Sequence, residues 1–117
     1  MSGTYEKSLL LDFYGELLTD KQRDCFDLHY NEDLSLAEIA EQLGISRQGV
    51  WDNIRRAEAS MQDMEEKTGI ISRFLSTRRS LEELRKMIDA LSSSDDPITK
   101  KTVPDIQKAL DAVLDTL

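Results

Sequence analysis

The chain has 117 residues, of which 23 are acidic and 15 are basic, so its formal net charge is −8 at pH 7. The single cysteine, Cys25, excludes an intramolecular disulfide, and the single histidine, His29, leaves little for a metal site or a histidine-dependent triad. No apolar run approaches the roughly 18 residues of a membrane span and no signal peptide is recognisable, so we expect a cytoplasmic protein of one domain's length.

Few glycines and prolines among many Leu, Glu, Lys and Arg residues favour an all-α fold. Apolar residues at helical spacing predict a first helix from Tyr5 to Leu18. A second helix is expected to begin after Thr19 and to run to about Tyr30. Thr19 and Gln22 have the spacing of a capping box, in which each side chain pairs with the other residue's backbone N–H.

Ser35 and Glu38 form a second capping-box pattern, which opens a short helix. Its inward-facing residues are expected to be Leu36, Ile39, Ala40 and Leu43. Gly44 follows where the chain needs a left-handed residue, a conformation that glycine adopts at the lowest cost. This pattern predicts a tight turn directly after the short helix.

Ser46 is the predicted N-cap of the next helix. The apolar stripe of this helix consists of Val50, Ile54, Ala57, Met61 and Met64. Two helices joined by a tight glycine-containing turn are the signature of a helix-turn-helix motif. We therefore expect a helix-turn-helix module at 1–68, in a winged-helix-like arrangement without a wing.

Residues 69–117 are predicted to form long C-terminal helices. Two sets of residues seven apart indicate a short heptad pattern: Phe74, Leu81 and Ile88, and then Thr77, Leu84 and Leu91. Residues 92–102 have the polar, proline-containing composition of a linker. A terminal amphipathic helix is expected to begin near Thr102, with Pro104 in its first turn. Its apolar residues are Ile106, Leu110, Val113, Leu114 and Leu117.

These C-terminal stripes must be buried, because the small helix-turn-helix core alone cannot stabilise a chain of this size. They pack either within the chain, against the first helix, or between two copies. A homodimer would arrange two reading helices about a two-fold axis, as in many DNA-binding proteins. We expect a homodimer, with 69–117 as its helical assembly segment.

The helix after Ser46 is the candidate reading helix. Its predicted nucleic-acid-binding residues are Ser46, Arg47, Gln48, Trp51, Asp52, Arg55 and Arg56. Residues 46–86 carry nine basic and seven acidic side chains, whereas residues 1–45 carry three basic and ten acidic ones. Contact with a polyanion must therefore come from the middle of the chain.

The side chains on this helix suit different parts of a nucleic acid. Arg47 can pair with guanine and Gln48 with adenine, whereas arginines further along can hold phosphates. The Ser46 hydroxyl or backbone N–H can contact a phosphate at the helix N-terminus. Trp51 can stack on an unpaired base, which suits structured RNA. Asp52 repels phosphate but can accept a hydrogen bond from a cytosine amino group.

Residues 18–61 resemble region 4 of bacterial housekeeping-type sigma factors. The shared positions are Leu18, Gln22, Tyr30, Leu34, Glu38-Ile39-Ala40, Leu43-Gly44-Ile45-Ser46, Val50, Arg56 and Ala57. Over residues 9–66 the segments FY-ELLTDKQ, LSLAEIAEQLGISRQ and V-DNI-R-E resemble the YlxM-like family of small helix-turn-helix proteins more closely. This resemblance implies a gene neighbourhood with signal recognition particle components and a regulatory role in that pathway.

The sequence thus predicts a noncatalytic regulatory or accessory protein that binds DNA or signal recognition particle RNA, with the particle's GTPase as a further candidate partner. No cofactor, metal site or enzymatic activity is expected, since no glycine-rich phosphate loop or calcium-loop spacing occurs. Two alternatives stay open. One is a transcription regulator at promoter DNA. The other is a module that docks on a protein such as the GTPase or RNA polymerase, with Trp51 as its interface anchor.

Overall fold

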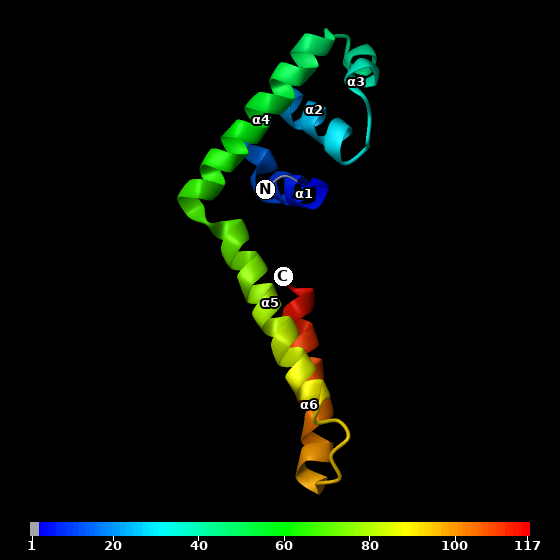
Figure 1. Cartoon of the computed structure of the whole chain (residues 1–117), viewed down its shortest axis with the longest axis vertical. Coiled ribbons are helices and arrows are strands. Elements are labelled where there is room, and N and C mark those ends of the chain that lie inside the picture. The colour runs from blue at the N-terminus through cyan, green and yellow to red at the C-terminus, as the bar shows by residue number, and fades with distance from the viewer. Residues whose placement is uncertain (1–2) are drawn as a thin grey trace. The chain divides into compact units, whose positions relative to one another are not determined.

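The computed structural model describes residues 3–117, apart from the side chain of Thr4. In chain order the elements are α1 (Thr4–Tyr14), the 3-10 helix η1 (Gly15–Leu17), α2 (Asp20–Tyr30), α3 (Leu36–Leu43), α4 (Arg47–Thr68), α5 (Ile70–Asp89) and α6 (Pro97–Asp115) (Figure 1). The described residues contain no β-strand, so no wing follows the helices there. The expected all-α class is confirmed.

The chain divides into two compact units, Met1–Ile71 and Ser72–Leu117. The first unit contains α1 to α4 and the first two residues of α5, and its core residues come from these helices and the turns between them. They are Leu9, Leu10, Tyr14, Leu18, Cys25, Phe26, Ile39, Ala40, Val50, Ile54, Ala57, Met61 and Ile71. The division of roles between a binding module and an assembly segment stays a prediction.

Local hydrogen bonds form the corner between the helices of the first unit, as predicted. Thr19 Oγ1 accepts from the Gln22 N–H and Gln22 Oε1 accepts from the Thr19 N–H, both at 3.2 Å. Ser35 and Glu38 form the same reciprocal pair at 3.1 Å. Gly44 is left-handed, with φ of 69°, and ends α3. Both predicted capping boxes and the predicted turn are confirmed.

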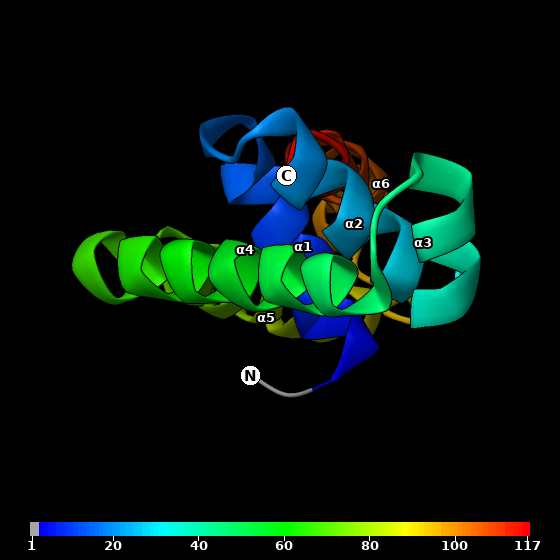
Figure 2. The same cartoon turned by 90° about the horizontal axis from the view of Figure 1, so that it is seen from above.

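Helix α4 packs its predicted stripe on the other three helices. Figure 2 shows α4 in front of α1 and α2, with α3 beside its N-terminal end, and residue contacts join α4 to all three. Val50, Ile54, Ala57 and Met61 are buried, as expected. Met64 was expected in the same stripe but is exposed. It borders a hollow of about 250 Å³ that Tyr14 and Leu17 also line, so no side chain covers it fully.

The first helix is shorter than predicted, because α1 ends at Tyr14 and a 3-10 turn follows. Gly15 lies at this point, and glycine is the least helix-favouring residue after proline. Leu18 then takes an extended backbone conformation and is buried. The chain therefore turns toward Thr19 one turn before the apolar spacing predicts.

Two polar side chains, Lys7 and Tyr14, fix α1 against its neighbours. Lys7 Nζ lies 2.7 Å from Glu58 on α4 and donates to the Tyr30 hydroxyl on α2 at 3.1 Å. Burial lowers the pKa of Lys7, but the hydrogen bonds to Glu58 and Tyr30 outweigh it, so the net pKa is raised and the ammonium stays charged. Tyr14 donates to Glu65 near the C-terminal end of α4 at 2.7 Å. Together these contacts join α1 to the C-terminal half of α4 and to the end of α2.

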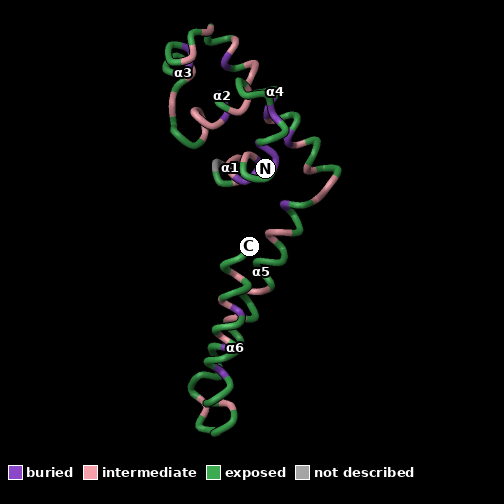
Figure 3. The backbone as a smooth tube through the Cα atoms, turned by 180° about the vertical axis from the view of Figure 1, so that it is seen from behind, coloured by how far each residue is buried: buried purple, intermediate pink, exposed green. Residues whose placement is uncertain are grey.

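The second unit is an antiparallel helical hairpin in which α6 runs back along α5 (Figure 1). Its core consists of Ile88, Val103 and Leu110, with Leu81 and Leu114 packed against them. Most other positions of the two helices are exposed or half-buried (Figure 3). The hydrophobic core of this unit is therefore small.

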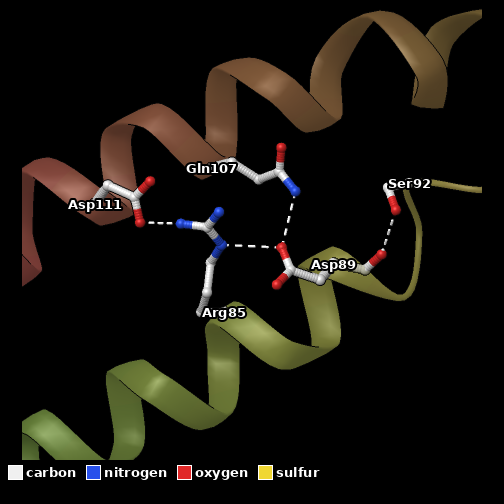
Figure 4. Close-up of polar contacts among 5 residues, drawn as sticks. All are labelled: Arg85, Asp89, Ser92, Gln107 and Asp111. Carbon is white, nitrogen blue, oxygen red and sulfur yellow. Dashed lines mark hydrogen bonds and ion pairs between the residues drawn. The ribbon is translucent and has the colours of Figure 1, made fainter.

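A polar network fixes the register of α5 against α6 (Figure 4). Arg85 donates from Nε to Asp89 at 2.9 Å and forms an ion pair with Asp111 on α6. Gln107 of α6 donates to the same Asp89 oxygen at 2.8 Å. Ser92, in the turn, donates to the Asp89 carbonyl at 2.6 Å. These bonds hold the end of α5 and the middle of α6 together.

The heptad interpretation of this unit is half right. Leu81 and Ile88 pack toward α6, but Thr77, Leu84 and Leu91 are exposed. The reason is that α5 contacts one antiparallel neighbour, so a single narrow stripe is covered. The second set of heptad positions lies outside that stripe.

The terminal helix begins earlier than predicted. Asp96 caps α6 by accepting from the Thr99 N–H at 2.9 Å, and Pro97 occupies the first helical position. Pro104 therefore lies inside the helix rather than in its first turn. The polar composition of residues 92–102 suggested a linker, but an Asp-Pro pair is also a strong helix start. The predicted linker is thus too long, since its last six residues are helical.

We expect the helical hairpin to lose stability below about pH 4, near the ordinary carboxyl pKa. Hydrogen bonds from Arg85 and Gln107 lower the pKa of Asp89, and those from Thr99 lower the pKa of Asp96. A lowered pKa means that the stabilisation is complete above the ordinary value of 3.8 and is lost as the pH falls through the folded-state value. Circular dichroism against pH measures this loss.

The double variant Asp89→Asn/Asp96→Asn should have a flatter acid limb in that titration. Asp95→Asn is the matched control, because within residues 3–117 the Asp95 side chain accepts no hydrogen bond. An acid limb of equal steepness in both variants would contradict the assignment.

Candidate nucleic-acid interface

All the predicted site residues lie in the N-terminal half of α4, apart from Ser46, which is its N-cap. The left-handed Gly44 ends α3, and Ser46 Oγ then accepts from the Gly49 N–H at 3.0 Å, which starts α4. The Ser46 hydroxyl is thus occupied as the helix cap. The buried Val50 and Ile54 hold one side of α4 against the core, so the residues between them face outward. Ser46, Arg47, Gln48, Trp51, Arg55 and Arg56 are exposed, and Asp52 is half-buried.

Asp52 is the centre of a polar cluster on this surface. Its Oδ1 accepts from Gln48 at 3.3 Å and from Arg55 at 3.2 Å. The Arg55 side chain is well exposed, so this ion pair adds little stability but neutralises the cation locally. Two predicted base- or phosphate-binding side chains are therefore already engaged with a carboxylate in the unbound protein.

Arg47 and Trp51 lie together at the end of α4 next to α3. They line a hollow of about 470 Å³ with Gln48 and Leu36. Trp51 is 41% exposed, which leaves much of its indole accessible. Leu36 was expected to point inward, but it is half-buried and forms part of the wall of this hollow. The hollow thus combines an aromatic ring, an aliphatic side chain and a cation.

Arg56 lies on the other side of α4, toward the start of α2. It lines a hollow of about 380 Å³ with Thr19, Gln22, Gly49, Asp52 and Asn53. Asn53 donates to the Gly49 carbonyl at 2.8 Å. Within the described residues neither Arg47 nor Arg56 forms an ion pair, in contrast to Arg55. The two arginines are therefore available as cations on either side of Asp52.

Sequence reasoning missed Leu36, Thr19, Gln22 and Asn53 as neighbours of this surface. The Asn53 bond to the helix backbone was detectable, because a four-residue spacing from Gly49 places the two groups on one side of α4. Thr19 and Gln22 come close to Arg56 only through the packing of α2 on α4, which no local pattern shows.

The remaining reactive residues have structural surroundings. Cys25 is fully buried, and burial raises the pKa of its thiol. His29 Nδ1 lies 2.9 Å from the Leu34 carbonyl and secures the loop after α2. Residues 3–117 contain no group of three or more His, Cys, Asp or Glu side chains arranged to hold a metal ion. None of the helices in the same range is long and apolar enough to cross a membrane.

Comparison with known proteins yields one family. A family model described as "Putative helix-turn-helix protein, YlxM / p13 like" matches residues 1–103. A UPF0122 protein of Acetivibrio thermocellus is 45% identical over 117 residues, covering 96% of this chain and 100% of the relative. One from Thermoanaerobacter sp. strain X514 is 43% identical over 105 residues, covering 89% of this chain and 90% of the relative. Another, from Desulforamulus reducens, is 42% identical over 97 residues, covering 83% of each chain.

Proposed function

Because the chain belongs to the YlxM / p13-like family of helix-turn-helix proteins, we propose that it is a noncatalytic accessory protein that binds nucleic acid through the N-terminal half of α4. The observation that carries this proposal is the pair Arg47 and Arg56, which are exposed on different sides of the N-terminal half of α4 and form no ion pair within the described residues. Cations in this arrangement neutralise phosphates, which supply most of the affinity for a nucleic acid.

The proposed target is the RNA of the signal recognition particle, and the proposed role is regulation in that pathway. The hollow beside Trp51 favours RNA over a closed duplex. An exposed indole next to a cation binds an unstacked base well, and such bases occur in RNA loops and bulges.

The particle's GTPase is a further proposed partner. A homodimer is also part of the proposal, since it would present two copies of α4.

Two other functions have support from specific features. Arg47 and Gln48 occupy the first turn of α4, from which helix-turn-helix proteins contact base edges in duplex DNA. This favours a promoter-binding regulator as the second candidate. The engagement of Arg55 and Gln48 by Asp52 favours the third candidate, a protein-docking surface centred on Trp51.

The Arg47→Ala/Arg56→Ala variant tests the proposal. We expect about tenfold weaker binding to signal recognition particle RNA and a salt dependence reduced by about two phosphate contacts. Fluorescence anisotropy over a range of salt concentrations measures both. In this proposal Arg47 contacts a phosphate of the RNA, whereas its pairing with guanine belongs to the promoter-DNA alternative. The effect is therefore expected to be similar across RNA sequences.

The matched control is Arg73→Ala/Arg79→Ala, which removes the same charge from exposed positions outside α4. It should leave affinity within about twofold, because it keeps every charge of α4. Equal losses in both double variants would show that total charge, not α4, determines binding. Absence of salt-dependent binding to RNA and to duplex DNA by the unaltered protein would leave only the docking function.

A further inference from the structure

One side of the α5–α6 hairpin carries exposed apolar side chains from both helices. Leu84 and Met87 of α5 and Ile106 and Val113 of α6 are each between 41% and 67% exposed. Seven of the large apolar residues that the chain exposes lie in this second unit: Leu84, Met87, Leu91, Ile98, Ile106, Val113 and Leu117. They outnumber the three buried residues of its core.

On α5 these residues lie to one side of the stripe that contacts α6. The contact stripe consists of Leu81, Arg85 and Ile88. Successive residues of an α-helix are rotated by about 100°, so Leu84 and Met87 lie roughly 60° and 120° from Leu81, in the same sense. Leu91 extends this side into the turn that follows α5.

On α6 the geometry repeats. Val103, Leu110 and Leu114 face α5. Ile106 and Val113 lie roughly 60° and 80° from Val103, rotated in the same sense as the α5 residues. Because the two helices are antiparallel, equal senses of rotation place both exposed stripes on the same side of the hairpin (Figure 1). The two stripes therefore form one continuous face.

This face has no charged residue from position 77 onward. At 100° per residue, nine helical residues from this position onward lie between about 40° and 120° from Leu81 or Val103, on the side of the hairpin that carries the exposed stripes. We call them the uncharged face: Thr77, Ser80, Leu84, Met87, Thr99, Thr102, Ile106, Ala109 and Val113. The opposite side of the hairpin holds seven charged residues: Arg78, Glu82, Arg85, Asp89, Lys100, Asp111 and Asp115. A helix pair with this segregation has one side suited to water and one side suited to burial.

We propose that the uncharged face binds the same face of a second copy of this chain, so that two hairpins form a four-helix bundle about a two-fold axis. A two-fold axis brings each surface patch onto itself, so any charge on the patch would meet its like. The absence of charges on this face removes that repulsion. Ser80, Thr102 and Ala109 are small, which lets the helices of the two copies approach closely.

The size of the face is sufficient for this role. From residue 77 to 87 and from 99 to 113 the helices extend about 15–21 Å, and two neighbouring helices are about 20 Å wide with their side chains. Including Leu91 and Leu117, each copy contributes on the order of 500 Å², and two copies bury about 1,000 Å², the lower end of specific interfaces. The uncharged face is thus the surface through which the homodimer of the proposed function would form. Its assignment does not depend on whether the protein binds nucleic acid.

Ala109→Glu and Ala112→Glu test this assignment as a matched pair. Both alanines are exposed in α6 and lie three residues apart, but Ala109 is on the uncharged face and Ala112 points away from α5. A glutamate at an exposed site does not disturb the fold of one copy, which circular dichroism can check. Sedimentation of the full chain over a range of concentrations gives the dimer dissociation constant.

We expect a dimer for the unaltered protein and for Ala112→Glu, and a dissociation constant at least about tenfold higher for Ala109→Glu, because two carboxylates would be buried without partners. Leu84→Lys should have the same effect from the other helix. A monomeric unaltered protein, or a dimer that both substitutions leave intact, would overturn the assignment. If the unaltered protein formed the dimer but did not bind RNA, only the proposed function would be contradicted.

Discussion

Replacing Trp51 with alanine is expected to weaken binding to an RNA with an unpaired loop by about 10- to 100-fold, the range for loss of one base–aromatic stack. Binding to a fully paired duplex should change by less than about threefold, because stacked bases are not available to the indole. Trp51 is 41% exposed and lines a hollow with Arg47 and Leu36, so it can reach a ligand without rearrangement. Anisotropy titrations with the two nucleic acids at one salt concentration measure the difference.

Trp51→Phe is the control for this prediction, since it keeps an aromatic face and should retain most of the affinity for the looped RNA. Equal losses for looped RNA and duplex would assign Trp51 to groove contact. Unchanged affinity for both would remove it from the interface.

Replacing Phe26 with alanine is expected to lower the free energy of unfolding of the first unit by about 3–5 kcal/mol. Phe26 is fully buried at the centre of α2, with its ring centroid 4.7 Å from that of Tyr30. Tyr30 in turn accepts a hydrogen bond from Lys7, so the cavity would also loosen α1. Urea unfolding followed by circular dichroism measures the change.

Leu17→Ala is the control for Phe26→Ala, because Leu17 is 65% exposed and its truncation should cost less than about 0.5 kcal/mol. If Phe26→Ala lost less than about 1 kcal/mol, the ring would not be the centre of the core. Phe26→Ala alters no residue of the interface. RNA binding should therefore fall only to the extent that the first unit unfolds.

The features that were predictable depend on residues close together in the sequence. Capping boxes at Thr19 and Ser35 need side chains three residues apart, and the turn at Gly44 needs one left-handed residue. The buried side of α4, except at Met64, follows from helical spacing. For these reasons the helix-turn-helix corner, and the positions that it leaves exposed, can be derived without the structure.

The features that were mispredicted depend on packing. Whether Leu84 is buried depends on the number of neighbours around α5, and heptad spacing does not give that number. The end of α1 at Tyr14 follows from how the next turn packs, although Gly15 is a local hint. The start of α6 was detectable, because Asp96 and Pro97 together favour a helix start, but the polar composition pointed to a linker. The position of Arg56 near Thr19 required the tertiary fold.

Asp52 gives the proposed interface a means of distinguishing between nucleic-acid ligands. Any polyanion that approaches α4 meets this carboxylate, and its phosphates compete with Asp52 for Arg55. Only a target that offers Asp52 a hydrogen-bond donor of its own, such as a cytosine amino group, recovers the lost interaction. Ligands without such a donor therefore all bind less tightly. Selectivity arises from weaker binding of the wrong ligands rather than from stronger binding of the correct one.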